Sequence, residues 1–508
     1  MYPCLYVDEI IRLIADELVA SNGLATSVSL ACCCKIFEDS VLDAIWETQS
    51  RVLPLLKSLP WEAWNEGGCV VSVPMACILP SLNRSIRKSF KRSPTALEWA
   101  RFRKYARRMR RLLIEDLGGS RDLSQEVLLA LQSQATDELL FPNLESFNVL
   151  GITKELIPFI PLFISTRTTA ITLAFYRPNS LPKAMVSSTI TNFPKLCPNL
   201  QRICIHPLPK DPMITAAVSE MLLASSRNTL RSIYVDSPLT EEACDVIYKR
   251  PDLHDLSVIV ERGASLPSVM LPNLAHLVVK YDHGGDWLPL FRGATLERLE
   301  AVSFYPRSEQ IGDFLEAFEG VALAACIQNT LSQFHFYTTY SWNPKYSSLL
   351  PFKHLTNLII EFSCSDGCSS RVDDDTITNL AQAMPKLDTV RLGDAPCHEI
   401  PTGVTTKGFE VLANHCPNLS TLCVHFQVAS LSAPPAIGGT ISDAGPTGQR
   451  RDCALTDLAV GEILVAEESV LVVAQTLVRI FPRIERFTGD TDESWEKVMD
   501  AIRLSRNH

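Results

Sequence analysis

The heptapeptide Cys197-Pro-Asn-Leu-Gln-Arg-Ile203 recurs along the sequence, and its recurrence decides the fold. Close copies begin at Phe141, Leu271 and Cys416, and looser copies begin at Met384 and Phe481. The common core starts at the leucine of the phrase, such as Leu200, and consists of one apolar residue, two variable positions, a second apolar residue, one variable position and a third apolar residue. A short phrase that returns along a chain indicates a structure made of stacked units.

The spacing of the phrase predicts the architecture. Apart from the last step, neighbouring copies lie 21 to 35 residues apart, which suits one short strand and one helical or irregular return per unit. The sequence therefore predicts an α/β leucine-rich-repeat solenoid, with short parallel strands on the concave side and helices on the convex side, preceded by a small all-α module. Indexed on the first apolar residue, the copies stand at Leu144, Leu200, Leu230, Leu253, Leu274, Leu296, Leu331, Leu355, Leu387, Leu419 and Ile484, with degenerate copies at Met109 and Thr168.

The longest segments between the phrases have the periodicity of amphipathic helices. Ile377, Leu380 and Met384 lie on one helical stripe, and Pro385 ends the pattern. The acids at residues 373–375 stand where a helix N-terminus favours negative charge. Residues 406–416 and 467–481 repeat this arrangement, so we expect helical returns there.

Two segments near the C-terminus carry no copy of the phrase. Residues 429–452 are rich in Ala, Ser, Gly and Pro without periodicity, which predicts a disordered insertion that accounts for most of the 65-residue step from Leu419 to Ile484. Residues 491–508 predict a helix that caps the last repeat. Its apolar stripe consists of Trp495, Val498, Met499 and Ile502.

Alternation along the strands predicts which side chains are exposed. The two later apolar residues of each phrase point into the core, so the residues between them point to the concave side. Their chemistry varies from repeat to repeat, which is typical of a recognition surface, although ordinary solvated side chains would give the same pattern. The predicted target-binding face consists of Arg202, His206, Tyr234, Asp236, His276, Lys280, Arg298, Glu300, His335, Tyr337, Asn357, Glu361, Arg391 and His425.

The N-terminal residues have a different pattern, which predicts three short helices at residues 8–18, 26–38 and 40–46. Residues 8–47, DEIIRLIADEL through TSVSLACCCKIFEDSVLDAIWE, resemble an F-box. With LEWARFRKYARRMRRLLI at residues 97–114 and the CPNL and MPKL phrases, nearly the whole chain resembles the fungal family of F-box and leucine-rich-repeat proteins.

This resemblance implies partners. It implies that the F-box-like module binds a Skp-family linker protein of a cullin ubiquitin-ligase complex, and that the repeats hold an unidentified target protein. The chain would then be the substrate-recognition adaptor of that ligase. The residues that the resemblance places at the linker or in the module core are Ile10, Ile14, Leu30, Phe37, Leu42 and Trp46.

Other interpretations stay open. Residues 1–50 can serve only as a cap on the solenoid, and the chain can be an interaction scaffold with a vestigial F-box and no link to ubiquitin. Phosphate-binding glycine loops, Gly-x-Ser-x-Gly and His-Glu-x-x-His are all missing from the sequence. We therefore expect a binding protein with no catalytic site, cofactor or metal.

Composition narrows the class of protein. The net charge of −10 argues against nucleic acid as a partner. Neither a signal peptide nor a run of about 20 apolar residues that could span a membrane is visible. Sixteen cysteines in 508 residues are too few for a disulfide scaffold. We expect a soluble protein of the cytoplasm and/or nucleus with reduced cysteines.

The stretch 84–111 contains twelve Lys/Arg and one acid. It could act as an import signal, but its spacing favours a helix that packs Trp99, Phe102, Ala106, Met109 and Leu113 inward. The expected domains are the module at 1–50, a helical or irregular linker at 51–95, the solenoid at 96–490 and the capping helix at 491–508.

Overall fold

The chain divides into two compact units, unit 1 (Met1–Ile247) and unit 2 (Tyr248–His508). The division falls inside the region that the repeats assign to a single solenoid. The structure is a computed structural model, and the residues that it describes are 7–21, 23–64, 90–115, 125–135, 139–225, 229–263, 269–282, 286–291, 294–307, 325–338, 346–362, 372–393, 404–424, 426, 428–432, 453–459, 465–488 and 493–506.

Unit 1 contains a parallel sheet whose strands follow chain order. Each strand pairs with the one before it, and its alternating side chains point into the core, as Phe147 and Val149 do. The degenerate copies at Met109 and Thr168 are confirmed, because each leads into a strand of this sheet. The strands are β1 (Thr48–Gln49), β2 (Arg111–Glu115), β3 (Ser146–Ile152), β4 (Ala170–Phe175), β5 (Arg202–His206) and β6 (Ser232–Val235).

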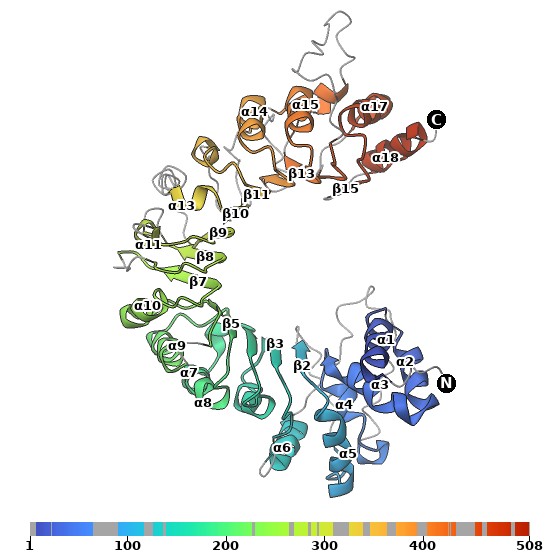
Figure 1. The fold of residues 1–508 in the computed structure, drawn as a ribbon, viewed down its shortest axis with the longest axis vertical. Helices are drawn as coiled ribbons and strands as arrows, with labels where there is room; N and C mark the ends of the chain where they lie inside the picture. Colours follow the sequence, from blue (N-terminus) through green and yellow to red (C-terminus); the bar gives the residue numbers. More distant parts are fainter. Residues whose placement is uncertain are drawn as a thin grey trace, which may run out of the picture. The chain divides into compact units, whose positions relative to one another are not determined.

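The helices that return the chain in unit 1 lie on one side of these strands, as Figure 1 shows for α7, α8 and α9. Aromatic rings fill the space between the layers, since Phe163 stacks on both Phe141 and Phe147. The return helices are α6 (Gln125–Gln134), η4 (Ile157–Phe163), η5 (Pro178–Ser180), α7 (Lys183–Thr191), α8 (Phe193–Leu196), α9 (Pro212–Ala224) and α10 (Glu241–Ile247).

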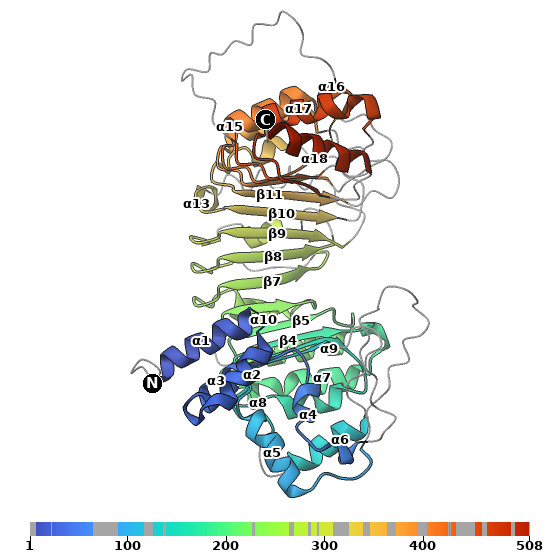
Figure 2. The ribbon, with the colours of Figure 1, turned by 90° about the vertical axis from the view of Figure 1, so that its right-hand side faces the viewer.

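Unit 2 has the same architecture, and Figure 2 shows β7 to β11 as successive neighbouring strands. Each strand pairs in parallel with the next one along the chain. The strands are β7 (Asp255–Val260), β8 (His276–Tyr281), β9 (Ala301–Pro306), β10 (Gln333–Thr338), β11 (Asn357–Phe362), β12 (Thr389–Leu392), β13 (Thr421–Val424), β14 (Asp457–Ala459) and β15 (Arg486–Thr488).

The helices of unit 2 cover one face of its sheet, and the other face is open. The three predicted helical returns are confirmed as α14, α15 and α17, and α18 buries all four residues of its apolar stripe. The helices are α11 (Leu288–Phe291), α13 (Ala325–Gln328), η6 (Tyr346–Leu349), α14 (Asp374–Ala383), α15 (Thr406–His415), α16 (Val428–Ser432), η7 (Glu467–Ser469), α17 (Val470–Ile480) and α18 (Glu493–Arg506).

The repeated phrase forms the turn that enters each strand. Its leucine is buried and its backbone N–H closes the turn, as Leu200 does by donating to Cys197 O. The asparagine side chain reaches back to the preceding turn. Asn199 Nδ2 lies 3.1 Å from Thr166 O, and Asn273 Nδ2 lies 2.9 Å from Pro251 O. The phrase therefore fixes both the entry into one strand and the distance to its neighbour.

The sheet contains one repeat that the sequence analysis missed. β14 begins within Leu455-Thr-Asp-Leu458, a copy of the phrase inside the 65-residue step that we had assigned mainly to the insertion. Both leucines are buried. The predicted insertion also begins too early, since α16 extends to Ser432 and buries Leu431. Residues 433–452 of the predicted insertion lie outside the described residues.

The N-terminal module contains three helices, but the boundary between the second and third was wrong. They are α1 (Asp8–Ala20), α2 (Leu24–Cys33) and α3 (Lys35–Glu47). The backbone is extended at Cys34, so Phe37 lies in the first turn of the third helix instead of ending the second. Val41 and Ala44 of α3 then pack on α1 along a single stripe.

A linking segment, α4 (Leu53–Leu56) and η2 (Trp61–Ala63), leads to α5 (Ala96–Ala106), which contains three of the twelve basic residues of the stretch 84–111. A capping box of Thr95 and Glu98 begins α5, and Arg92 with Thr95 lowers the pKa of Glu98 to about 2. Trp99 and Phe102 are buried as the spacing predicts, while Leu113 is not. The helix has ended by then, and Leu113 faces outward from β2.

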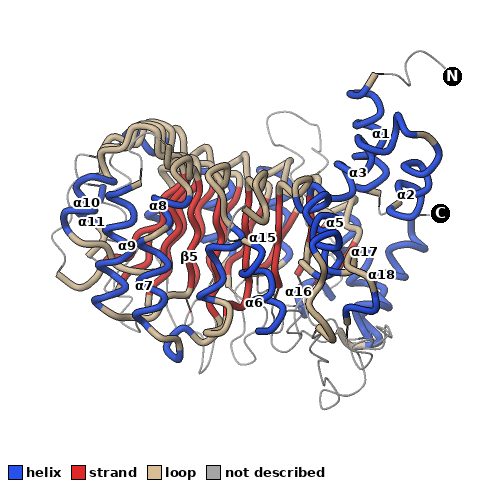
Figure 3. The backbone as a smooth tube through the Cα atoms, turned by 90° about the horizontal axis from the view of Figure 1, so that it is seen from below, coloured by secondary structure: helices blue, strands red, loops and turns tan. Residues whose placement is uncertain are grey.

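Strand pairing thus determines both the fold class and which face of the sheet is open. The parallel sheet with one strand per repeat confirms the predicted leucine-rich-repeat solenoid, with its strands on one face and its helices on the other. Figure 3 shows these two layers, the strands in red and the helices in blue.

Candidate functional site

The open strand face of unit 2 brings polar and aromatic side chains together at its centre. In the register of β8 to β11, Lys280 pairs with Tyr305, and Tyr337 pairs with Glu361. His335 stands two residues before Tyr337 on the same face. We call Tyr305, His335, Tyr337, Glu361 and Arg391 the central cluster; four neighbouring strands, β9 to β12, supply its members.

Direct contacts hold the central cluster together. The rings of Tyr305 and Tyr337 are tilted against each other with centroids 6.1 Å apart. Arg391 Nη1 donates to Glu361 Oε1 at 2.6 Å across the next pair of strands. These contacts fix two rings and one ion pair in place before any partner arrives, which lowers the entropic cost of binding.

Burial favours the neutral forms of two members of the cluster, His335 and Tyr305. Desolvation lowers the pKa of His335 even though the Glu361 carboxylate acts in the other direction. Burial, together with Glu361 and Tyr337, raises the pKa of Tyr305. The Nε2 atom of His335 is buried and has no hydrogen-bond partner among the residues that the structure describes. A partner that supplied one would gain a hydrogen bond at this point.

Five of the predicted face residues lie at or next to the centre of unit 2. Lys280, His335, Tyr337, Glu361 and Arg391 share its outward rows, and His276 and Asn357 lie in the row nearest the strand entries. His276 Nδ1 is 2.6 Å from Asp255 Oδ1. His425 lies outside the described residues.

The remaining predicted face residues lie in unit 1 or off the strands. Arg202, Tyr234 and His206 face outward from β5 and β6, and Asp236 follows β6 directly. Arg298 and Glu300 were misplaced, because they lie in the turn before β9. The sequence offers leucines at 296 and 299, and the structure uses Leu299 as the first apolar residue of the phrase.

That shift of three residues explains why Tyr305 was missed. Counting from Leu299, the outward positions of β9 are Ala301, Ser303 and Tyr305, and the last of these enters the central cluster. The signal was present in the sequence, since Leu299, Val302 and Phe304 complete the phrase. Both leucines are fully buried, so burial alone would not have separated the two registers.

The N-terminal module exposes an apolar surface. The side chains of Ile10, Leu13 and Ile14 on α1 are 37%, 69% and 42% exposed, and Leu24 and Val28 on α2 are exposed as well. We call these five residues the module face. Monomeric proteins seldom leave neighbouring large apolar residues in water unless they bind something.

The other residues that the F-box resemblance singled out are packed against the chain or half-buried. Leu30 and Phe37 pack on the module core, which is formed by Ile11 and Ala15 of α1 with two residues of α3. Trp46 stacks on Tyr105 of α5 with ring centroids 5.0 Å apart. Leu42 is half-buried.

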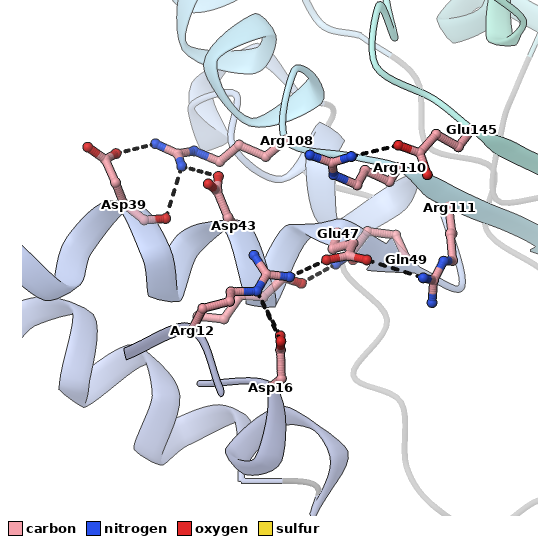
Figure 4. Close-up of polar contacts among 11 residues, drawn as sticks. Arg12, Asp16, Asp39, Asp43, Glu47, Gln49, Arg108, Arg110, Arg111 and Glu145 are labelled. Atoms are coloured by element: carbon pink, nitrogen blue, oxygen red, sulfur yellow. Dashed lines mark hydrogen bonds and ion pairs between the residues drawn. The ribbon is translucent and has the colours of Figure 1, made fainter. Parts of the chain in front are cut away.

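Ion pairs fasten the module to the first repeats, as Figure 4 shows. Arg108 contacts both Asp39 and Asp43 of α3. Glu47, at the end of α3, contacts Arg12 of α1 and Arg111 of β2. The chain then continues directly into β1, which pairs with β2. The module is therefore held in a fixed orientation on the sheet of unit 1.

Cys416, which begins one copy of the repeated phrase, is fully buried. Burial raises the pKa of Cys416 to about 12, and its thiol lies 3.7 Å from Met384 O and 3.9 Å from Ala381 O. It is a core residue at the start of a turn. Within the described part of the chain, no cluster of metal-ligating side chains and no helix long and apolar enough to cross a membrane is present.

Strand pairing and the open face define the class of this molecule: it is a leucine-rich-repeat solenoid protein. No family model matches the sequence, and no curated protein matches it. Solved structures do match, among them an internalin from Listeria monocytogenes, with 12% sequence identity and a TM-score of 0.27 over 78% of this chain and 79% of the internalin chain. The fold assignment rests on the strand pairing of this chain itself.

Proposed function

We propose that this chain is the substrate-recognition adaptor of a Skp–cullin–F-box type ubiquitin ligase. In this proposal the module face binds a Skp-family linker protein, and the open strand face binds a target protein. Such an adaptor makes and breaks no bonds itself. It raises the concentration of the target at the ligase by holding both partners at once.

The module face is the observation that carries the proposal. The module fills its own small core with Ile11, Ala15, Val41 and Ala44, yet α1 leaves Ile10, Leu13 and Ile14 in contact with water. A helix that served only as a cap would turn its apolar residues toward the sheet. The ion pairs at Arg108 and Glu47 instead fix α3 to the sheet and leave this side of α1 uncovered.

The scaffold alternative also has support. β1 extends the sheet by one strand, so the end of the module does cover the first repeat. Deleting residues 1–50 would remove β1 and uncover Tyr105, and unit 1 would lose stability under either function. A point substitution on the module face separates the two functions more cleanly.

The test is the affinity of the full-length chain for a purified Skp-family linker protein, measured by calorimetry. Leu13→Glu places a charge at the most exposed of the large apolar residues of α1, where it should leave the fold intact. If about 1.5–3 kcal/mol comes from burying this side chain, the affinity should fall by about tenfold or more. Leu97→Glu is the control, because Leu97 is 82% exposed on α5 and lies outside the module.

Two outcomes would contradict the adaptor. One is a wild-type chain that ignores the linker protein, which would favour the scaffold alternative. The other is binding that Leu13→Glu and Leu97→Glu reduce equally, which would place the linker elsewhere.

A further inference from the structure

Arginines line the edge of unit 1 at which the chain enters its strands. Exposed arginines occur in the turns or first positions of β2, β4, β5 and β6. We call this set the arginine edge. Its members are Arg107, Arg110, Arg111, Arg167, Arg202 and Arg231.

Backbone pairing places these residues side by side. Glu145 N donates to Arg110 O, and each following strand entry repeats the bond, until Arg231 N donates to Gln201 O. In the adjacent row, Arg111 and Arg202 occupy equivalent positions on β2 and β5. Because parallel strands lie about 4.8 Å apart, the edge from β2 to β6 extends roughly 19 Å.

One end of the arginine edge already binds carboxylates of the chain itself. Arg111 Nη2 lies 3.4 Å from Glu47 Oε1 at the end of α3. Arg110 Nη1 lies 2.6 Å from Glu145 Oε1. Beside them, Arg108 holds Asp39 and Asp43, so that an acidic helix is docked against this end of unit 1 (Figure 4).

At the other end of the edge, the arginines form no ion pair within the part of the chain that the structure describes. Arg167 Nη1 bonds only to the neutral amide oxygen of Asn143, at 3.0 Å. Among the described residues, Arg202 and Arg231 form no ion pair. The same side-chain chemistry that receives α3 thus continues along the sheet, and no carboxylate of a described residue pairs with it.

We propose that Arg167, Arg202 and Arg231 bind an acidic segment of a partner protein, which would continue the row of carboxylates that α3 begins. Every member of the edge is an arginine, and the planar guanidinium pairs with carboxylate or phosphate groups through two parallel hydrogen bonds. Aspartate, glutamate or phosphoserine side chains would supply these groups.

The surroundings of the edge favour protein over nucleic acid. The residues between the arginines are small or polar, namely Ser146, Thr169, Ala170, Gln201 and Ser232. They offer no aromatic ring on which a base could stack. The net charge of −10 would also repel a long polyanion at a distance.

This surface is separate from the module face, so the inference does not depend on the adaptor function. The experiment measures binding of fluorescent peptides to the full-length chain at low ionic strength, where exposed charges are least screened. One peptide is rich in Asp and Glu, a second carries phosphoserine in place of some of the acids, and a third has the same length with neutral amides.

The decisive variant is Arg202→Glu/Arg231→Glu. The control variant is Lys154→Glu/Lys210→Glu, which makes the same change in net charge after the far ends of β3 and β5. We expect the first variant to weaken binding of the acidic peptides by about tenfold and the control to weaken it by less than about twofold. The ratio between the Asp/Glu and phosphoserine peptides identifies the preferred anion.

Three results would overturn the inference: no binding of either acidic peptide, equal loss in both variants, or tighter binding of single-stranded RNA that Arg202→Glu/Arg231→Glu abolishes. Leu13→Glu should leave the peptide affinity unchanged. Failure of the linker experiment and failure of this one are therefore distinguishable.

Discussion

His335 shows how one side chain of the sheet takes part in the central cluster of the open face. It leaves β10 on the open face, beside both tyrosines of the central cluster, and its buried Nε2 atom is without a hydrogen-bond partner in the described structure. Burial lowers its pKa below the ordinary value of 6.5. The neutral imidazole is thus the form that the folded chain prefers.

This preference predicts a dependence of stability on pH. The unfolded chain binds a proton at His335 below about pH 6.5, while the folded chain does so only at lower pH, so stability present above that value is lost as the pH falls through the folded pKa. We expect His335→Gln, which cannot be protonated, to lose less thermal stability than the wild type between about pH 7 and pH 5. Melting temperatures at the two pH values test this, and equal losses would contradict it.

Residue positions were the hardest part of the site to predict. His335, Tyr337 and Glu361 follow from alternation once the phrase at Leu331 and Leu355 is recognised. Tyr305 does not, because leucines three residues apart both satisfy the phrase before β9. Pairing with β8 and β10 decides between them, and that pairing is a property of the assembled sheet.

At the scale of elements, the turn is the unit that the sequence specifies best. The phrase supplies a buried leucine, a closing backbone hydrogen bond and an asparagine that reaches the previous turn. Asn143 Nδ2 does so at 2.6 Å from Arg107 O, in the manner of Asn199 and Asn273. Repetition of this phrase explains why most strands were found from sequence.

Loss of one such bond should be measurable. Asn199→Ala should lower the free energy of unfolding of unit 1 by about 1 kcal/mol, because the Thr166 carbonyl loses its hydrogen-bond partner. Asn418→Ala is the control, since Asn418 occupies the same position of the phrase and makes no such bond within the described structure. Chemical denaturation measures both, and equal effects would show that the amide contributes through something other than this bond.

Elements without strict repetition were predicted less well. β14 was overlooked because its phrase follows a segment rich in Gly and Pro, which drew attention to the insertion. The break between α2 and α3 at Cys34 also has no marker in the sequence, since neither Gly nor Pro stands there. Packing of Val41 and Ala44 against α1 determines where α3 begins.

At the scale of the whole molecule, the two units differ in net charge. Unit 1 contains 26 Lys/Arg and 25 Asp/Glu, whereas unit 2 contains 21 and 32. The boundary between them lies between two ordinary repeats and is not visible in the phrase. Unit 1 carries the module face and the arginine edge, and unit 2 carries the central cluster, so the surfaces available to partners are distributed over both units.

The proposed adaptor function depends most on the module face. Amide hydrogen exchange of the full-length chain, with and without a Skp-family linker protein, tests it directly. The account predicts that the linker slows exchange in α1 and α2 while exchange in β9 to β12 stays unchanged. Unchanged exchange in α1 and α2, or protection confined to the strands, would contradict it.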